Sequence, residues 1–114
     1  MSVTLYGIPN CDTMKKARKW LYEHAIEYQF HDYKKHGLDE STLRDWVREL
    51  GWEALLNRRG MMWRKLDENT KKTIDEQSAI QVMLNTPSII KRPLLDTGKK
   101  RYVGFSEGLY QEIF

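Results

Sequence analysis

The spacing of apolar side chains changes within the first fourteen residues, and this change restricts what the chain can fold into. Residues 3–7 have the character of a short strand that ends at Gly7. Residues 8–10, Ile-Pro-Asn, are turn formers. From Asp12 onward, apolar side chains recur at helical spacing, at Met14, Ala17, Trp20 and Leu21. The sequence therefore predicts a strand, a tight turn and a helix.

The strands predicted further along the chain complete a mixed sheet. Ile26, Tyr28 and Phe30 alternate with polar residues, so a second strand is expected there, followed by a loop over 34–37. A strand–helix–strand start favours parallel pairing of its two strands. A strand over 89–95, interrupted by Pro93, and a return strand over 101–105 form a hairpin around the turn 96–99. We expect an α/β fold with a mixed four-stranded sheet and flanking helices.

The middle of the chain and its end are predicted to be helical. A helix capped by Asp39 or Ser41 runs to Gly51 and is followed by a short helix over 52–57 and a loop over 58–62. Asp75 begins a further helix that stops before a proline, and Ser106 caps the last one.

The composition indicates one small domain with no internal disulfide. The 114 residues suit a single domain, and one cysteine cannot form a bridge within the chain. No signal peptide or membrane-spanning run is recognisable, so we expect a cytoplasmic monomer without a membrane partner. Basic and acidic residues alternate along the chain at a net charge of +3, which does not favour a nucleic-acid partner. The densest basic clusters, 34–36 and 99–101, are expected to be solvated turns.

Cys11 stands where the predicted turn meets the predicted helix. Unpaired backbone N–H groups and the helix dipole stabilise a thiolate at such a position, and the thiolate is the nucleophilic form of cysteine. Met14 occupies the position three residues on, where a second cysteine would make a dithiol pair. Any disulfide chemistry at Cys11 therefore needs an external thiol.

Arg92 and Pro93 interrupt a run that otherwise has strand character. A proline there requires a bent strand or a cis peptide bond. Arg92 could pair with an acidic side chain, or it could hold an anion beside the thiolate, because its planar guanidinium suits oxyanions and carboxylates.

Three segments in order, residues 6–17, 55–60 and 89–94, together resemble the ArsC/Spx family and, within it, the YffB-like branch. The resemblance extends over essentially the whole chain. It implies a single thioredoxin-like domain over residues 1–114 with a helical insertion at roughly 39–85. It also implies a nucleophile at Cys11, an anion-binding Arg92, and a cis Pro93 that faces the cysteine.

The resemblance further implies an arginine in the loop after Leu55-Leu56. Arg59 or Arg58 can fill this role, whereas a gap-free match places Asn57 there. Asn10, beside the cysteine, joins Arg92, Arg59 and Pro93 among the candidate substrate-binding residues.

This chain departs from the family's arsenate reductases at two positions. Those enzymes have a histidine four residues before the cysteine, where this chain has Gly7. They also have an arginine just before the segment that opens the last helix, where this chain has Gly104. Spx-type regulators usually carry a second cysteine where Met14 stands. Arsenate reduction and an internal redox switch are therefore not expected.

The resulting hypothesis is a glutathione-dependent thiol reductase that acts through a mixed disulfide. Glutathione is its co-substrate and a glutaredoxin a potential partner. We expect no tightly bound cofactor and no metal, because His24, His31 and His36 lack metal-ligand spacing with Cys11. The alternative is a non-enzymatic, Spx-like protein that binds the transcription machinery.

Overall fold

The computed structural model describes residues 2–114 and divides the chain into two compact units. The first contains residues 2–36 and 92–114, and the second contains residues 37–91. The predicted helical insertion at 39–85 lies inside the second unit.

The first unit is built around a mixed four-stranded sheet. Its elements are β1 (Thr4–Gly7), α1 (Asp12–Glu23), β2 (Gln29–Asp32), α2 (Tyr33–His36), β3 (Leu94–Asp96), β4 (Arg101–Val103) and α8 (Glu107–Ile113). The strand order is β2-β1-β3-β4. β1 runs parallel to β2 and antiparallel to β3, which is antiparallel to β4. The predicted mixed sheet is confirmed.

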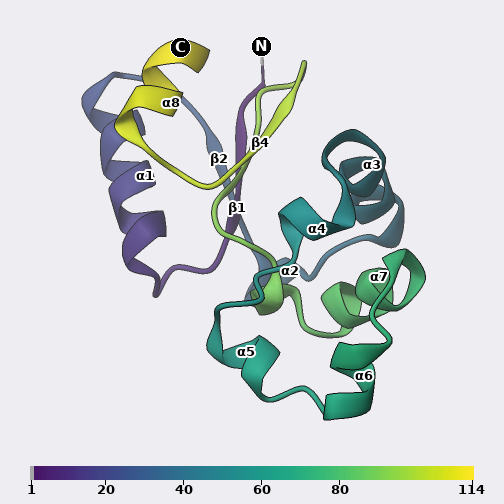
Figure 1. The fold of residues 1–114 in the computed structure, drawn as a ribbon. Helices are drawn as coiled ribbons and strands as arrows, with labels where there is room; N and C mark the ends of the chain where they lie inside the picture. The colour runs from purple at the N-terminus through teal and green to yellow at the C-terminus, as the bar shows by residue number, and fades with distance from the viewer. Residues whose placement is uncertain (1) are drawn as a thin grey trace. The chain divides into compact units, whose positions relative to one another are not determined.

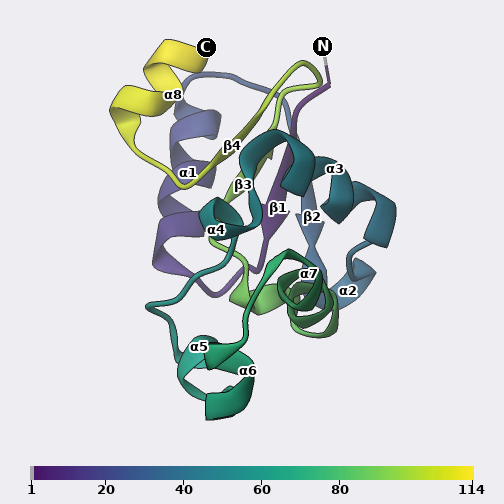
Figure 2. The same cartoon turned by 45° about the vertical axis from the view of Figure 1, so that its right-hand side comes forward.

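The hydrophobic core of this unit lies on one face of the sheet. Figures 1 and 2 show α1 and α8 on the same side of the strands. The buried residues of this core are Val3, Leu5, Met14, Ala17, Trp20, Leu21, Leu95 and Tyr110. Because successive strand residues point to opposite faces, Leu5 faces this core and Tyr6 faces away from it.

The region around β2 differs from the sequence prediction. The strand begins at Gln29, three residues later than expected, because only residues 29–32 pair with β1. The predicted loop over 34–37 is also wrong, since residues Tyr33–His36 form α2. The carboxylate of Asp32, which is buried, accepts a hydrogen bond from the Lys34 N–H at 2.9 Å and so supports the start of this short helix.

The strand predicted over 89–95 is shorter than expected. Only Leu94–Asp96 pair with β1, whereas residues Pro87–Ile89 form a 3-10 helix, η1. The Arg92–Pro93 peptide bond is cis, as the family resemblance implies.

The second unit is helical. Its elements are α3 (Glu40–Leu50), α4 (Trp52–Leu55), α5 (Met61–Arg64), α6 (Glu68–Lys72), α7 (Glu76–Asn85) and η1. Its buried side chains are Leu43, Trp46, Val47, Leu55, Leu56, Ala79, Ile80, Met83, Ile89 and Ile90. An isolated antiparallel bridge joins Leu56 to Ile90. The sequence did not predict α5 and α6, which are only one turn long and lack buried residues that would reveal a period.

Side-chain caps define where these helices start. Asp39, and not Ser41, caps α3 by accepting from the Thr42 N–H at 3.3 Å. Gly51 ends α3 with a φ of +88°, which favours glycine. Asp75 and Ser78 form a capping box at the start of α7. No helix within residues 2–114 is long and apolar enough to cross a membrane.

The cap of α8 gives a test of the fold. The Ser106 side chain accepts a hydrogen bond from the Leu109 N–H at 3.0 Å, and α8 contributes Tyr110 to the core. Ser106→Ala should lower the free energy of unfolding by about 1 kcal/mol, because a backbone N–H loses its partner. Urea denaturation measures the change. Ser2→Ala, at an exposed position, is the control, and equal stability of the two variants would contradict the assignment.

Candidate active site at Cys11

Cys11 lies between the end of β1 and the start of α1. The turn from Gly7 to Cys11 contains only residues 8–10, so the thiol stands at the helix N-terminus. Its backbone is extended, with φ −142° and ψ 128°, as is usual for the residue that precedes a helix. The side chain is half-buried, and the cysteine is free. The predicted strand, turn and helix are confirmed.

Five influences set the acidity of Cys11. Burial raises the pKa of the thiol, because a low-dielectric environment disfavours the charged form. Hydrogen bonds to the sulfur from the Met14 N–H, the Arg92 side chain and the Thr13 N–H lower the pKa, as does the charge of Arg92. The favourable contacts outweigh burial, and the pKa of Cys11 lies below its ordinary value. The thiolate is therefore favoured relative to a free cysteine.

Arg92 is brought to Cys11 by the pairing of β1 with β3. Leu94 pairs with Tyr6, so the residues that precede Leu94 lie at the same end of the sheet as the turn before Cys11. The Nε atom of Arg92 is buried, and its side chain hydrogen-bonds the Cys11 sulfur. The structure thus places the predicted nucleophile and the predicted arginine together.

The two arginines after Leu55-Leu56 have different surroundings within the second unit. The Arg58 guanidinium lies over the ring of Trp52 at 4.9 Å and near that of Trp63 at 5.8 Å. It also lies 3.7 Å from the Glu53 carboxylate. Arg59 is exposed. Because Arg58 is held by these aromatic and acidic neighbours, Arg59 is the better candidate for a ligand-binding arginine.

Asn57, the gap-free alternative, has a structural part in this loop. Its side chain accepts a hydrogen bond from the Arg59 N–H at 3.1 Å, which stabilises the turn. A hollow of about 470 Å³ lies beside this turn, lined by Glu53, Leu56, Asn57, Arg58, Arg59 and Lys91. Sequence reasoning missed Lys91. Its position directly before Arg92 is the one signal that could have indicated it.

Asn10 and Pro93 complete the predicted set. Asn10 is exposed in the turn before Cys11. Pro93 is buried, and its carbonyl accepts a hydrogen bond from the Gly104 N–H at 2.9 Å. Pro93 therefore shapes the chain beside Arg92, and Asn10 is open to a ligand.

Gly7 and Gly104 stand where the family's arsenate reductases have a histidine and an arginine. A different feature of the structure accounts for each glycine. A Cβ atom at Gly7 would lie 2.5 Å from the Met14 sulfur, so the buried Met14 side chain occupies the space a larger residue would need. Gly104 has open space around it but a φ of +87°, which strains any other residue. Neither missing group can be restored without a shift of this local structure.

The basic cluster over 99–101 is a solvated turn at Lys99 and Lys100, which are exposed, but not at Arg101. Arg101 lies in β4, and its Nε atom is 3.5 Å from the Asp96 carboxylate. Its side chain is only 29% exposed. The antiparallel register places Arg101 opposite Asp96, and this cross-strand pair explains the burial. Residues 34–36 likewise belong to α2.

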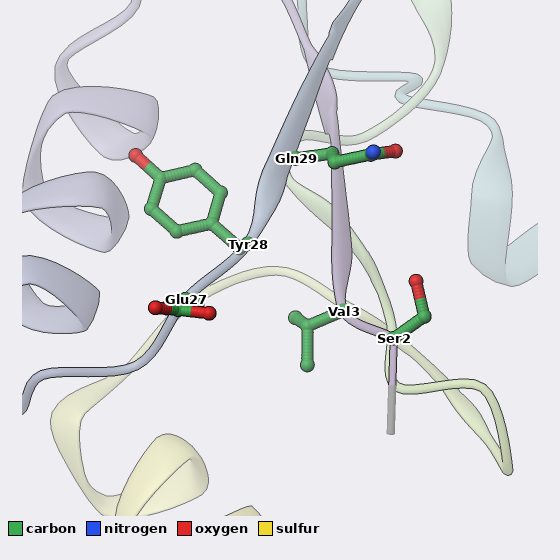
Figure 3. Close-up of a pocket in the computed structure, with 5 residues that line it drawn as sticks. All are labelled: Ser2, Val3, Glu27, Tyr28 and Gln29. Carbon is green, nitrogen blue, oxygen red and sulfur yellow. The ribbon is translucent and has the colours of Figure 1, made fainter.

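Another hollow lies where β1 and β2 begin, at the end of these strands that is opposite to Cys11. It has a volume of about 460 Å³ and is lined by Ser2, Val3, Glu27, Tyr28 and Gln29 (Figure 3). These residues precede or begin β1 and β2, whereas Cys11 follows the end of β1. Glu27 is the only acidic residue of the lining, and no thiol contributes to it. Within residues 2–114, no three or more His, Cys, Asp or Glu side chains gather to hold a metal ion.

Comparisons with known proteins agree with this geometry. Residues 6–113 match the family model described as the ArsC family. The solved structure of a protein named YffB is 52% identical to this chain, with a TM-score of 0.94 and 97% of each chain covered. An arsenate reductase (ArsC) related protein from Brucella melitensis is 53% identical, with a TM-score of 0.81, over 98% of this chain and 93% of that one. The predicted thioredoxin-like fold is confirmed by these similarities.

A regulator is also similar to this chain. The global transcriptional regulator Spx of Streptococcus pyogenes serotype M3 is 29% identical over 107 residues, which are 92% of this chain and 79% of the regulator. Both branches named in the sequence resemblance are thus represented among the similar proteins.

The contact between Arg92 and Cys11 can be tested by titration. Arg92→Ala should raise the pKa of Cys11 by about one unit, because an adjacent positive charge favours the thiolate. The thiolate is lost as the pH falls through this pKa, so alkylation by iodoacetamide should decline at a higher pH in the variant. Ultraviolet absorbance of the thiolate and the alkylation rate both measure the shift.

Lys99→Ala is the matched control, since Lys99 is an exposed cation in the same unit. An equal titration midpoint for the wild type and Arg92→Ala would show that Arg92 does not act on the thiol.

Proposed function

Because this chain belongs to the ArsC family, we propose that it is a glutathione-dependent thiol reductase that works through a mixed disulfide at Cys11. The observation that supports this most is the place of Cys11 at the start of α1, where its surroundings, with Arg92 among them, lower the pKa of the thiol. A buried structural cysteine needs no such surroundings, whereas a nucleophilic one does.

The reaction proceeds by thiol–disulfide exchange. The Cys11 thiolate attacks a sulfur of a glutathione mixed disulfide, the new bond joins Cys11 to the glutathione sulfur, and the other sulfur leaves as a thiolate. A second glutathione thiolate then attacks this mixed disulfide and releases Cys11 as a thiolate together with oxidised glutathione. Two electrons pass from glutathione to the substrate, and the departing thiolate takes its proton from solvent.

An external thiol is required for the second step. Cys11 is the only cysteine in the chain, and Met14 stands where a resolving thiol would be. Glutathione, or a glutaredoxin that uses it, fits this requirement, and both are present in the cytoplasm, where we expect the protein to act.

The charged groups have separate parts in this proposal. Arg92 stabilises the thiolate before attack and then interacts with a carboxylate of the bound glutathione. Arg59 and Lys91, which line one hollow of the second unit, are the candidate carboxylate-binding cations of that unit. Asn10 and Pro93 border the thiol and limit how the peptide approaches it.

The regulator alternative rests on the similarity to Spx alone. In this chain the position expected to hold the second cysteine of a redox switch is Met14, which is fully buried in the core. Capture of the transcription machinery equally by the wild type and by Cys11→Ala would support the alternative, because the thiol would then have no part in binding.

The central prediction concerns the mixed disulfide. Incubation with oxidised glutathione should add one glutathionyl group per chain, because the lowered pKa of Cys11 supplies the attacking thiolate. Intact-mass spectrometry measures the addition, and excess glutathione with glutaredoxin should reverse it. Cys11→Ser should gain no mass. An unmodified wild-type chain, under conditions that modify another low-pKa cysteine protein, would refute the reductase proposal.

Arsenate should be a poor substrate. Gly7 and Gly104 leave the site without two charge-stabilising groups of the family's arsenate reductases, and losing one preorganised donor costs roughly 10²–10³ in rate. A coupled assay with glutathione, glutaredoxin and NADPH should show little or no arsenate-dependent turnover. Turnover comparable to that of an arsenate reductase assayed in parallel would contradict this expectation.

A further inference from the structure

The charges of α1 are placed against the order that stabilises a helix. The N-terminal end of a helix favours carboxylates, and its C-terminal end favours cations. Asp12 follows this order, but Lys15 and Lys16 lie within the first five residues of α1, and its last turn contains Glu23 and no basic residue. The stability of the helix therefore does not account for these lysines.

Lys15, Lys19 and Tyr22 form one stripe along α1, on the side opposite to the core. They are four and three residues apart, so they lie above one another on the helix. The residues of α1 that enter the core are Met14, Ala17, Trp20 and Leu21. Both lysines are exposed, and Tyr22 is 84% exposed. This surface, the α1 stripe, thus presents two cations and a large aromatic ring to solvent.

The neighbouring Arg18 has a structural role instead. Its Nε–H donates to the Tyr28 hydroxyl at 3.0 Å, and its guanidinium lies 4.4 Å from the centre of the Phe30 ring. Because Phe30 belongs to β2 and Tyr28 lies just before this strand, these contacts join α1 to the sheet. The packing of the first unit therefore explains Arg18, but it does not explain the α1 stripe.

The α1 stripe begins beside the nucleophile. The Lys15 N–H donates to the Cys11 carbonyl at 3.0 Å, so Lys15 lies one helical turn beyond Cys11. A rise of about 1.5 Å per residue places Lys19 about 12 Å and Tyr22 about 16 Å from Cys11 along the helix axis. An extended tripeptide spans only about 10 Å. Glutathione joined to Cys11 is therefore too short to cover the stripe, whereas the surface of a protein is large enough.

We propose that the α1 stripe is the docking surface for an acidic protein whose thiol releases Cys11 from its mixed disulfide. This inference rests on the proposed function, because it assigns the partner of the second step. Carboxylates of the partner face Lys15 and Lys19, and attraction between these charges raises the rate of encounter. Tyr22 packs against the partner as an aromatic anchor of the kind that is enriched in protein interfaces.

The docked partner takes the glutathionyl group from Cys11. The partner's thiolate attacks the glutathione sulfur, a disulfide forms between these two sulfurs, and the bond from glutathione to Cys11 breaks. Cys11 leaves as a thiolate, the form that its surroundings favour. The Cys11 sulfur is reduced and the partner's thiol is oxidised, so the partner supplies both electrons of the step.

The test compares a protein thiol with a small thiol on the same mixed disulfide. Cys11 is loaded with thiopyridyl-activated glutathione, and intact mass follows its release by an acidic dithiol glutaredoxin or by 2-mercaptoethanol. The ratio of the two rates cancels any change in Cys11 itself, because the same bond breaks in both reactions. At low ionic strength, the double substitution Lys15→Glu and Lys19→Glu should lower this ratio about tenfold. Tyr22→Ser should lower it about threefold.

The double substitution Lys99→Glu and Lys100→Glu is the matched control. Both lysines are exposed in the first unit, and Asp96, just before their turn, pairs with Thr4 at the end of the sheet opposite to Cys11. This variant has the same net charge as the α1 variant and should keep the wild-type ratio. An equal fall in both variants, or an unchanged ratio in the α1 variant, would overturn the proposal. In 1 M salt, where the Debye length is about 3 Å, the wild type should lose most of its advantage over the α1 variant.

A second measurement detects docking without any reaction. The Cys11→Ser chain is titrated with the same glutaredoxin, its active-site cysteines replaced by serine, and the backbone amide signals of α1 are followed by NMR. The signals of Lys15, Lys19 and Tyr22 should shift, and salt should reverse the shifts. Absence of these shifts, or their appearance with a DNA duplex but not with the glutaredoxin, would overturn the proposal. The reaction of the wild type with oxidised glutathione decides the reductase proposal separately.

Discussion

The stabilisation of a negative charge on one sulfur atom is the interaction around which this site is organised. Burial alone would favour the neutral form of the half-buried Cys11 thiol. The N–H groups of Thr13 and Met14 oppose this effect, because they stabilise the thiolate. The opposing contacts come from two separate parts of the sequence. The backbone donors follow Cys11 directly, whereas Arg92 arrives through the antiparallel pairing of β3 with β1. The nucleophile therefore depends on the sheet as much as on the helix.

The site has fewer charged groups than the arsenate reductases of the family, and its packing explains why. The Met14 side chain fills the space at Gly7, and Gly104 has a backbone conformation that other residues adopt only with strain. In our proposal the substrate supplies what is missing, because glutathione brings its own sulfur electrophile and needs only its carboxylates held.

In the second unit, the neighbouring residues Arg58 and Arg59 have different surroundings and different expected roles. Arg58 contacts two tryptophan rings and a carboxylate, which satisfies its charge and fixes its position. Arg59 follows it directly and stays exposed beside a hollow that Lys91 also lines. Stacked arginines stabilise a loop, whereas a solvated arginine can meet a ligand.

Local physical chemistry made much of this protein predictable from sequence. The change of period before Asp12, the caps at Asp39, Asp75 and Ser106, and the helix-start position of Cys11 depend on residues only a few positions apart. The family resemblance added the cis Pro93 and chose between the two roles that the residues alone had left open for Arg92.

The tertiary structure decided the rest, because those features depend on partners far along the chain. Which residues of β2 pair, the burial of Arg101 against Asp96, the aromatic contacts of Arg58 and the hidden hydroxyl of Tyr33 all follow from register and packing. A pattern of apolar residues records which side chains are buried, but it does not record what they are buried against.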